Sequence, residues 1–339
     1  MAKQDLSYDQ IIRDLQQKKY APVYLLMGEE SYYIDLISDF IQYNILDDSQ
    51  REFDQLIVYG KDTEISSIIN AARRFPMISP YQILIVKEAQ HIKELEKMEF
   101  YLQNIPKTTI LVICYKYGTV DGRRKWVTDL KKAGGIVYES VKLKDYEMGS
   151  WINKYASGKG LQLEEKAVLM LSDFLGTDLS KVANELDKLA ITNPPGSGRI
   201  TPDIIEKNIG ISKDFNIFEL QDALINDDKL KAFRIIRYFA DNPKANPIQV
   251  FAAQLFGFFS NLMLFHYLPV KTAEAAATDL RVHPFVAKNY VKAAKRFNGW
   301  KTMKIIGWIR ETDARSKGVN NVATDDGDLM KELIYKILH

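Results

Sequence analysis

Five short, almost continuously apolar segments in the first 140 residues constrain the fold more than any other feature. They are rich in β-branched and aromatic residues and lie at 23–27, 53–59, 82–86, 109–115 and 136–138. Helical patterns separate them, first from Ser7 onward and then at 32–45, 63–74, 92–103 and 122–133. Strands of this kind, alternating with helices, are typical of a parallel sheet with helices on both faces. Residues 1–140 are therefore predicted to form an α/β domain.

Strand patterns are absent from the rest of the chain. Short helices are predicted at 145–157, 163–175, 179–191 and 202–210, and longer ones at 216–224, 229–240, 247–268, 284–297, 301–317 and 326–338. A chain of 339 residues is long for a single core. We therefore expect a small helical domain over 141–211 and an all-α domain over 212–339.

The composition is that of an ordinary globular protein. The 46 basic and 44 acidic side chains give a formal net charge of +2, which argues against a broadly basic nucleic-acid coat but leaves room for a local basic patch. The single cysteine, Cys114, lies in an apolar run and is predicted to be a packed core thiol. With no signal-peptide pattern at the N-terminus, a reducing, cytoplasmic location is expected.

One uncharged stretch tests this interpretation, because residues 248–268 are long enough to cross a bilayer. Polar residues interrupt the stretch, and Gln254, Gly257 and Asn261 fall on one helical stripe. A buried helix with a small polar seam is therefore preferred over a membrane span.

The first strand leads into a turn where P-loop proteins hold a triphosphate. A working loop reads G-x-x-x-x-G-K-[ST], and its lysine reaches the β- and γ-phosphates. Here the turn is Gly28-Glu29-Glu30-Ser31, with one glycine, no lysine and two carboxylates that would repel an anion. The pattern indicates a nucleotide-binding scaffold that has lost its phosphate site.

A second part of the ATP machinery is altered as well. An ATPase needs a strand that ends in Asp-Glu, to hold Mg²⁺ and position water, whereas the strand at 83–86 ends in Lys87-Glu88. The four histidines show no metal-ligand spacing; they are His91, His266, His283 and His339. We therefore expect no intrinsic catalysis, no cofactor and no metal.

The connection before the third strand carries large apolar residues between two prolines. It contains Phe75, Pro76, Met77 and Ile78, and ends at Pro80. Proline stiffens a loop in an extended state, so adjacent apolar side chains on it can form a pre-organised plug for a partner's pocket. Equally, these side chains could seal the end of their own domain core. The sequence alone leaves the two interpretations open.

Basic residues gather with aromatics near residues 288–301. Lys288, Lys292 and Lys295 fall along one helical face, with Arg296 and Lys301 beside them. Such a face could contact nucleic-acid phosphates, but a lysine stripe is more often the solvated side of a helix.

Four segments, in order along the chain, resemble the delta-subunit family of the bacterial DNA polymerase III clamp loader. They are residues 22–30 at the first strand, 178–189 (DLSKVANELDKL), 218–224 (FELQDAL) and 308–318 (WIRETDARSKG). The likeness spans all three predicted domains. It implies an AAA+-like first domain with a RecA-type sheet, a helical lid and a C-terminal collar that joins the subunits of a pentamer.

The resemblance also implies partners and a binding site. Delta subunits do not hydrolyse ATP; they join the tau/gamma ATPase subunits and delta-prime, and they open the sliding clamp (β) for loading onto primer–template DNA. Apolar residues after a first-domain helix enter a pocket of the clamp. By position these are Met77 and Ile78 here, with Phe75 and Pro76 beside them, although the family often shows Leu-Phe or Phe-Phe.

The leading hypothesis is a non-catalytic clamp-loader subunit within the DNA polymerase III holoenzyme, a nucleotidyltransferase complex that acts in DNA replication. Two alternatives stay open at this point. One is a degenerate AAA+ ATPase or nucleotide switch, and the other is a stand-alone DNA-binding protein that uses Lys288 to Lys301.

Overall fold

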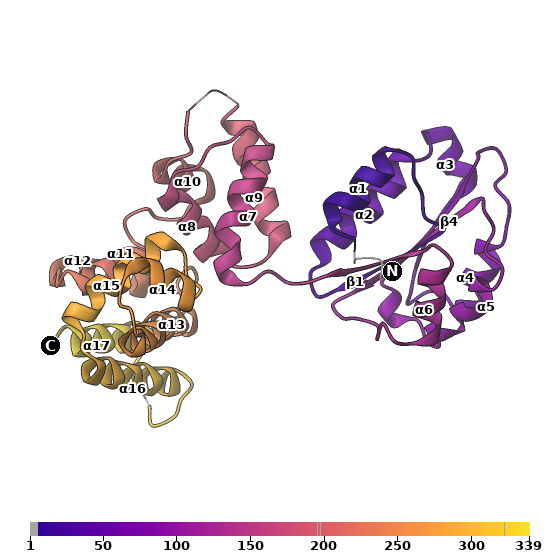
Figure 1. The fold of residues 1–339 in the computed structure, drawn as a ribbon. Helices are drawn as coiled ribbons and strands as arrows, with labels where there is room; N and C mark the ends of the chain where they lie inside the picture. Colours follow the sequence, from indigo (N-terminus) through magenta and orange to yellow (C-terminus); the bar gives the residue numbers. More distant parts are fainter. Residues whose placement is uncertain (1–5, 195, 197, 322) are drawn as a thin grey trace. The chain divides into compact units, whose positions relative to one another are not determined.

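The structure is a computed structural model that describes residues 6–194, 196, 198–321 and 323–339. The chain forms two compact units, the first ending at Leu143 and the second running from Lys144 to His339. Each unit is described separately (Figure 1). The predicted division of the helical part near residue 211 stays a prediction.

The first unit is built on five parallel strands in the order β2-β3-β4-β1-β5, within the described residues. The strands are β1 (Val23–Gly28), β2 (Gln55–Tyr59), β3 (Gln82–Lys87), β4 (Thr109–Lys116) and β5 (Ile136–Ser140). The helices are α1 (Tyr8–Gln16), α2 (Ser31–Asn44), α3 (Asp48–Asp54), α4 (Ile65–Ala72), α5 (Glu99–Leu102) and α6 (Lys125–Lys132), with short 3₁₀ turns η1 (Ala89–His91) and η2 (Leu95–Met98). The predicted α/β fold with a parallel sheet is confirmed.

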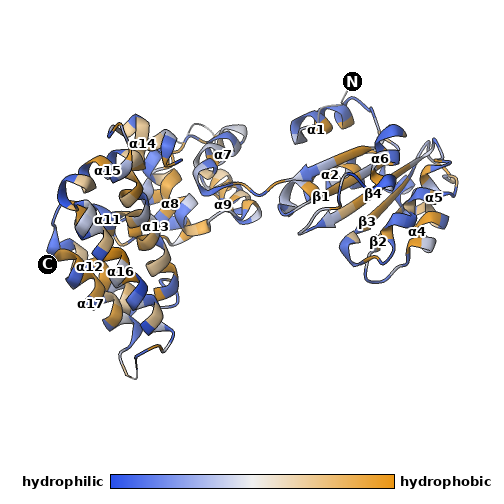
Figure 2. Cartoon of the chain, turned by 60° about the horizontal axis from the view of Figure 1, so that its bottom comes forward, coloured by the Kyte–Doolittle hydropathy of each residue, from blue (hydrophilic) through white to orange (hydrophobic). Residues whose placement is uncertain are grey.

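Alternate residues of each strand enter two separate cores. On one face Tyr24 and Leu26 of β1 pack with α1 and α2. On the other, Val23, Leu25 and Met27 pack with α4, α5 and α6. Figure 2 shows the apolar central strands between helices whose outer faces are polar. This is the burial on both faces that near-continuous apolar strands predict. The predicted core thiol Cys114 is buried here, and burial raises its pKa to about 11.

Two local predictions in this unit are wrong. Residues 53 and 54 belong to helix α3 rather than to a strand, because Asp47 and Gln50 form a capping box that starts a helix at Asp48. The predicted helix at 92–103 is broken instead into η2 and α5, since Glu94 adopts a left-handed backbone with φ of 58°. The remaining helices and strands lie where the sequence predicted them, to within a few residues.

In its described residues the second unit consists of helices and their connections, with one isolated β-bridge between Leu163 and Ile200. Its helices are α7 (Asp145–Gly158), α8 (Glu165–Leu175), α9 (Leu179–Thr192), α10 (Pro202–Ile209), α11 (Ile217–Ile225), α12 (Lys229–Asp241), α13 (Ile248–Tyr267), α14 (Ala273–Asp279), α15 (Pro284–Arg296), α16 (Gly299–Ser316) and α17 (Asp326–Leu338). Helix α14, capped by Thr272, was not predicted. The largest core joins α11 to α17, from Ile217 to Leu338.

Helix α13 lies in this core and packs against α11, α15, α16 and α17. Among the described residues it is the one helix long and apolar enough to cross a membrane by length and composition. Three of its polar side chains have partners on other segments: Gln254 bonds Asp173, Asn261 bonds the Tyr290 hydroxyl and His266 contacts the Phe297 carbonyl. These contacts favour the predicted core helix with a polar seam.

Gly28 ends β1 in a position that only glycine can occupy. Its φ is +139°, and a Cβ there would overlap the backbone carbonyl of Ser140 at the end of β5. Its amide donates to the Gly118 carbonyl at 2.8 Å. The single glycine of this turn therefore has a packing role.

We predict that Gly28→Ala lowers the free energy of unfolding by at least about 3 kcal/mol, because it adds both an overlap and backbone strain. The matched change Gly122→Ala, at a glycine with open space around it, should stay within about 0.5 kcal/mol. Urea denaturation of the two variants measures both values, and equal midpoints would contradict the packing role.

Candidate functional site

The loop between α4 and β3 exposes the apolar residues that the sequence singled out. Phe75 is 79% exposed, Met77 74% and Ile78 57%. Side chains this exposed do not seal the core of their own unit, so that interpretation is wrong. Adjacent apolar side chains left in water are instead typical of an interaction site.

Both ends of this loop are held by the sheet and its helices. The amide of the Gln82 side chain donates to the Ala71 carbonyl at 3.1 Å, and the Thr109 hydroxyl donates to the Ala72 carbonyl at 3.0 Å. Arg73 donates to the Phe100 carbonyl at 2.8 Å. The first two bonds satisfy carbonyls at the end of α4 that have no partner in the helix, and the third ties the residue after α4 to α5. The loop therefore leaves the helix from a fixed point.

The middle of the loop is held by one carboxylate, that of Asp54 at the end of α3. It accepts hydrogen bonds from the backbone amides of Met77, Ile78 (3.0 Å) and Ser79 (2.7 Å). Asp54 itself is 3% exposed. Burial alone would raise its pKa, but the hydrogen bonds from these three residues outweigh burial and hold the pKa below its ordinary value.

Sequence reasoning missed Asp54, because it placed residues 53–59 in a strand. The signal that could have found it was the Asp47/Gln50 capping box. A helix that starts at Asp48 ends near Asp54 and turns into β2 there. Which amides that carboxylate would meet could not be predicted, because the partners lie more than twenty residues along the chain.

The turn after β1 lies at the opposite edge of the sheet, and only two residues separate Gly28 from the start of α2. Glu29 is exposed, whereas Glu30 is buried and caps α2 by accepting from the Tyr32 amide at 2.9 Å. The position of the anion is thus taken by the protein's own carboxylate. This geometry has neither the loop length nor the charge of a phosphate cradle.

Lysines at the ends of the neighbouring strands are paired with carboxylates of α2. Lys116, which ends β4, lies 2.6 Å from Asp35, and Lys87, which ends β3, lies 3.7 Å from Asp39. Lys87, at the position where an ATPase carries its metal carboxylate, therefore joins an ion pair with the helix that follows the turn. Among the described residues no group of three or more His, Cys, Asp or Glu could hold a metal ion.

The five basic residues that the sequence suggested as nucleic-acid contacts fall into two groups. Lys288, Lys292 and Lys295 are exposed on α15, as the helical spacing predicted. Arg296 and Lys301 are half-buried: Arg296 pairs with Asp227 at 2.6 Å, and Lys301 lies over the Trp308 ring. The pKa of Lys301 is lowered by burial and by the nearby cations Lys304 and Arg296.

Two family models match the chain. DNA polymerase III, delta subunit, matches residues 24–140, and DNA polymerase III delta subunit, C-terminal domain, matches residues 214–325. The chain belongs to the DNA polymerase III delta-subunit family. Together the two models take in the sheet, the exposed loop and most of the core around α13.

Individual relatives of this delta-family chain agree over almost its whole length. DNA polymerase III subunit delta of Bacillus subtilis is 24% identical over 319 residues, which cover 90% of each chain. The solved structure of the Bacillus subtilis DNA clamp loader delta protein is 21% identical, covers 98% of this chain and 99% of its own, and has a TM-score of 0.57. That structure supports the fold.

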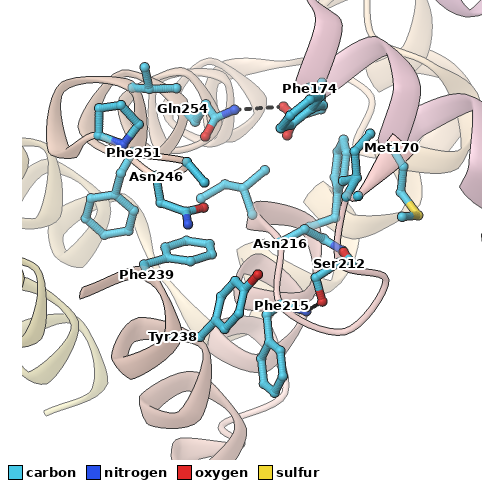
Figure 3. Close-up of a pocket in the computed structure, with 18 residues that line it drawn as sticks. Met170, Phe174, Ser212, Phe215, Asn216, Tyr238, Phe239, Asn246, Phe251 and Gln254 are labelled. Atoms are coloured by element: carbon cyan, nitrogen blue, oxygen red, sulfur yellow. Dashed lines mark hydrogen bonds between the residues drawn. The ribbon is translucent and has the colours of Figure 1, made fainter. Parts of the chain in front are cut away.

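A cavity of about 240 Å³ lies in the helical unit of this delta-family chain, between α8 and helices α11 to α13. Its wall includes a group of aromatic side chains, among them Phe174, Phe215, Tyr238, Phe239 and Phe251 (Figure 3). It lies in the other unit from the exposed loop and is lined by none of the residues predicted for clamp or DNA contact. At its rim the Gln254 side chain donates to Asp173 at 3.0 Å.

Asp173 makes the stability of this unit depend on pH. Burial raises its pKa to about 7, and the hydrogen bond from Gln254 only partly offsets the rise. Because the pKa in the folded protein lies above that of the unfolded chain, the stabilisation is complete below about pH 4 and is lost as pH rises towards 7.

We predict that Asp173→Asn, which mimics the protonated acid and can still accept from Gln254, raises the free energy of unfolding by about 1–2 kcal/mol at pH 8. This value is below the full effect of the pKa shift, because water screens a half-buried carboxylate. At pH 4 the variant and the wild type should be equally stable. Asp241→Asn, at an exposed aspartate, serves as the control in urea titrations at both pH values, and a gain that does not depend on pH would contradict the assignment.

Proposed function

We propose that this chain is the clamp-binding subunit of a bacterial clamp loader and helps to open the sliding clamp during DNA replication. The loop residues Phe75, Pro76, Met77 and Ile78 bind a hydrophobic pocket on the clamp. The observation that carries the proposal is the exposure of three apolar side chains on a loop whose backbone is firmly held. Membership of the delta-subunit family supports it.

Interface hot spots are large apolar or aromatic side chains that enter a partner's pocket and lose their water there. An anchored loop loses little conformational entropy on binding, so more of the contact energy appears as affinity. The Met77–Ile78 pair keeps the bulk that such a pocket needs.

Opening the ring requires only differential binding. A subunit that binds the open clamp more tightly than the closed one shifts the clamp towards the open state by the difference in the two binding free energies. The subunit itself needs no nucleotide chemistry for this, which agrees with the two-residue turn after β1 and the Glu30 cap. ATP binding and hydrolysis are assigned to the tau/gamma subunits, and delta-prime completes the pentamer through the helical collars.

The exposed lysines on α15 are assigned a secondary part in this proposal. Lys288, Lys292 and Lys295 are free to approach the phosphates of primer–template DNA once the loader has assembled in the cytoplasm. Arg296 and Lys301 already have intramolecular contacts, so they are weaker candidates.

We predict that changing Met77 and Ile78 together to Ala weakens binding to the sliding clamp by at least about 2 kcal/mol, the scale of interface hot spots. Both side chains are exposed, so the free energy of unfolding should change by no more than about 0.5 kcal/mol. Surface plasmon resonance with immobilised clamp measures the affinity.

The matched control changes Val141 and Ile191 together to Ala. Both are exposed aliphatic residues on other segments, 69% and 81% exposed, and their loss should leave clamp affinity unchanged. If the loop variant binds the clamp as tightly as the wild type, these residues are not the anchors.

A further inference from the structure

We propose that Asp54 is a positioning residue for the clamp-binding loop: its carboxylate fixes the loop backbone so that the apolar side chains are held in their binding conformation before the clamp arrives. This inference rests on the proposed function. It concerns a residue that does not itself reach the partner, because Asp54 is buried beneath the loop.

The hydrogen-bond partners of the backbone N–H groups in the loop support this role. Between Pro76 and Pro80 the chain has only three amide N–H groups, since proline has none. All three, those of Met77, Ile78 and Ser79, donate to the carboxylate of Asp54. One side chain therefore satisfies every backbone donor of the segment.

This arrangement separates the backbone of the loop from its side chains. The amides point inward to Asp54, while Met77 and Ile78 remain 74% and 57% exposed. The Ser79 hydroxyl donates to the Tyr81 carbonyl at 2.6 Å and ties the end of the loop to the start of β3. The apolar side chains are thus left free for a partner, while the backbone that carries them has no donor left for water.

The chemistry calls for a carboxylate. Ionised aspartate offers two acceptor oxygens and no donor, and hydrogen bonds to an ionised group are stronger than neutral ones. Asparagine offers one oxygen and an NH₂ group that would face an amide N–H. At least one loop amide would then lose its partner, and the loop would sample other conformations.

Pre-organisation has a measurable consequence for binding. The apparent dissociation constant equals the intrinsic one divided by the fraction of molecules in the binding conformation. If loss of the Asp54 carboxylate reduces that fraction to a tenth or less, clamp affinity falls at least tenfold although every contacting side chain is present.

The test is Asp54→Asn in the full chain, with Asp47→Asn as the matched control. Asp47 lies at the other end of α3 and also accepts from a backbone amide, that of Gln50 at 2.9 Å, but its hydrogen bonds are to Ser49 and Gln50 within α3 rather than to the loop. Clamp affinity is measured with purified sliding clamp at a temperature where circular dichroism shows each variant to be folded. Hydrogen exchange reports the protection of the Met77, Ile78 and Ser79 amides.

We expect Asp54→Asn to bind the clamp at least tenfold more weakly and to lose protection at the three amides, while Asp47→Asn does neither. In a chain that already carries Met77→Ala and Ile78→Ala, adding Asp54→Asn should cause no further loss of affinity, because Asp54 acts only through those side chains. A general loss of structure would weaken both backgrounds alike.

Two results would overturn the assignment while leaving the proposed function intact. One is wild-type affinity in Asp54→Asn, and the other is an equal loss in both backgrounds. Should Asp54→Asn fail to fold, Asp54→Glu takes its place; it keeps both oxygens on a longer arm, and wild-type affinity together with lost amide protection would again contradict the role. A wild-type chain that does not bind the clamp would instead refute the proposed function, whatever the amides show.

Discussion

A parallel sheet has to be covered on both faces, and the first unit is organised by this requirement. Alternate side chains of β1 enter two cores, one under α1 and α2 and the other under α4 to α6. With both faces covered, a ligand or partner can reach the sheet only at its amino end, where the strands begin, or at its carboxyl end, where they finish. At the carboxyl edge, where open α/β folds usually bind ligands, Gly28 packs against Ser140 and Glu30 caps α2. The exposed loop precedes β3 and therefore lies at the amino edge. The proposed clamp-binding loop therefore lies at the opposite ends of the strands from the position where such folds bind nucleotides.

Much of this could be predicted from the sequence. Near-continuous apolar strands and their alternation with helices are strong signals, and both the sheet and the helical unit follow from them. The altered phosphate turn and the apolar loop were also visible, since each depends on residues that are neighbours in the chain. The sequence could not decide whether Phe75, Met77 and Ile78 seal a core or face water, because burial depends on the other segments packed nearby.

The wrong or missed predictions have two causes. In some segments two local signals favour different structures, and in others the role of a residue depends on partners far along the chain. The apolar side chain of Phe53 favoured a strand in the sequence analysis. The capping box at Asp47 favours a helix, and the helix continues to Asp54. Glu94 stops a helical pattern through a left-handed backbone, which residue type alone does not indicate. Asp54 was missed because its role depends on amides that only the tertiary fold brings to it. The side-chain contacts of α8 with Gln254, Glu219 and His283 likewise join segments that are far apart in the sequence.

The two-residue turn between β1 and α2 limits what amino-acid replacements could achieve in such a chain. The phosphate-loop motif places four residues between its glycines, whereas Glu29 and Glu30 alone fill the gap here, and Ser140 closes the space beside Gly28. No single amino-acid replacement in this turn, including one that introduces lysine, would add the backbone residues that a phosphate-binding loop needs. An insertion would have to be matched by a rearranged β5 and a new cap for α2. Single replacements therefore cannot turn this connection into a phosphate-binding loop, because both the length of the backbone and the space beside it would have to change.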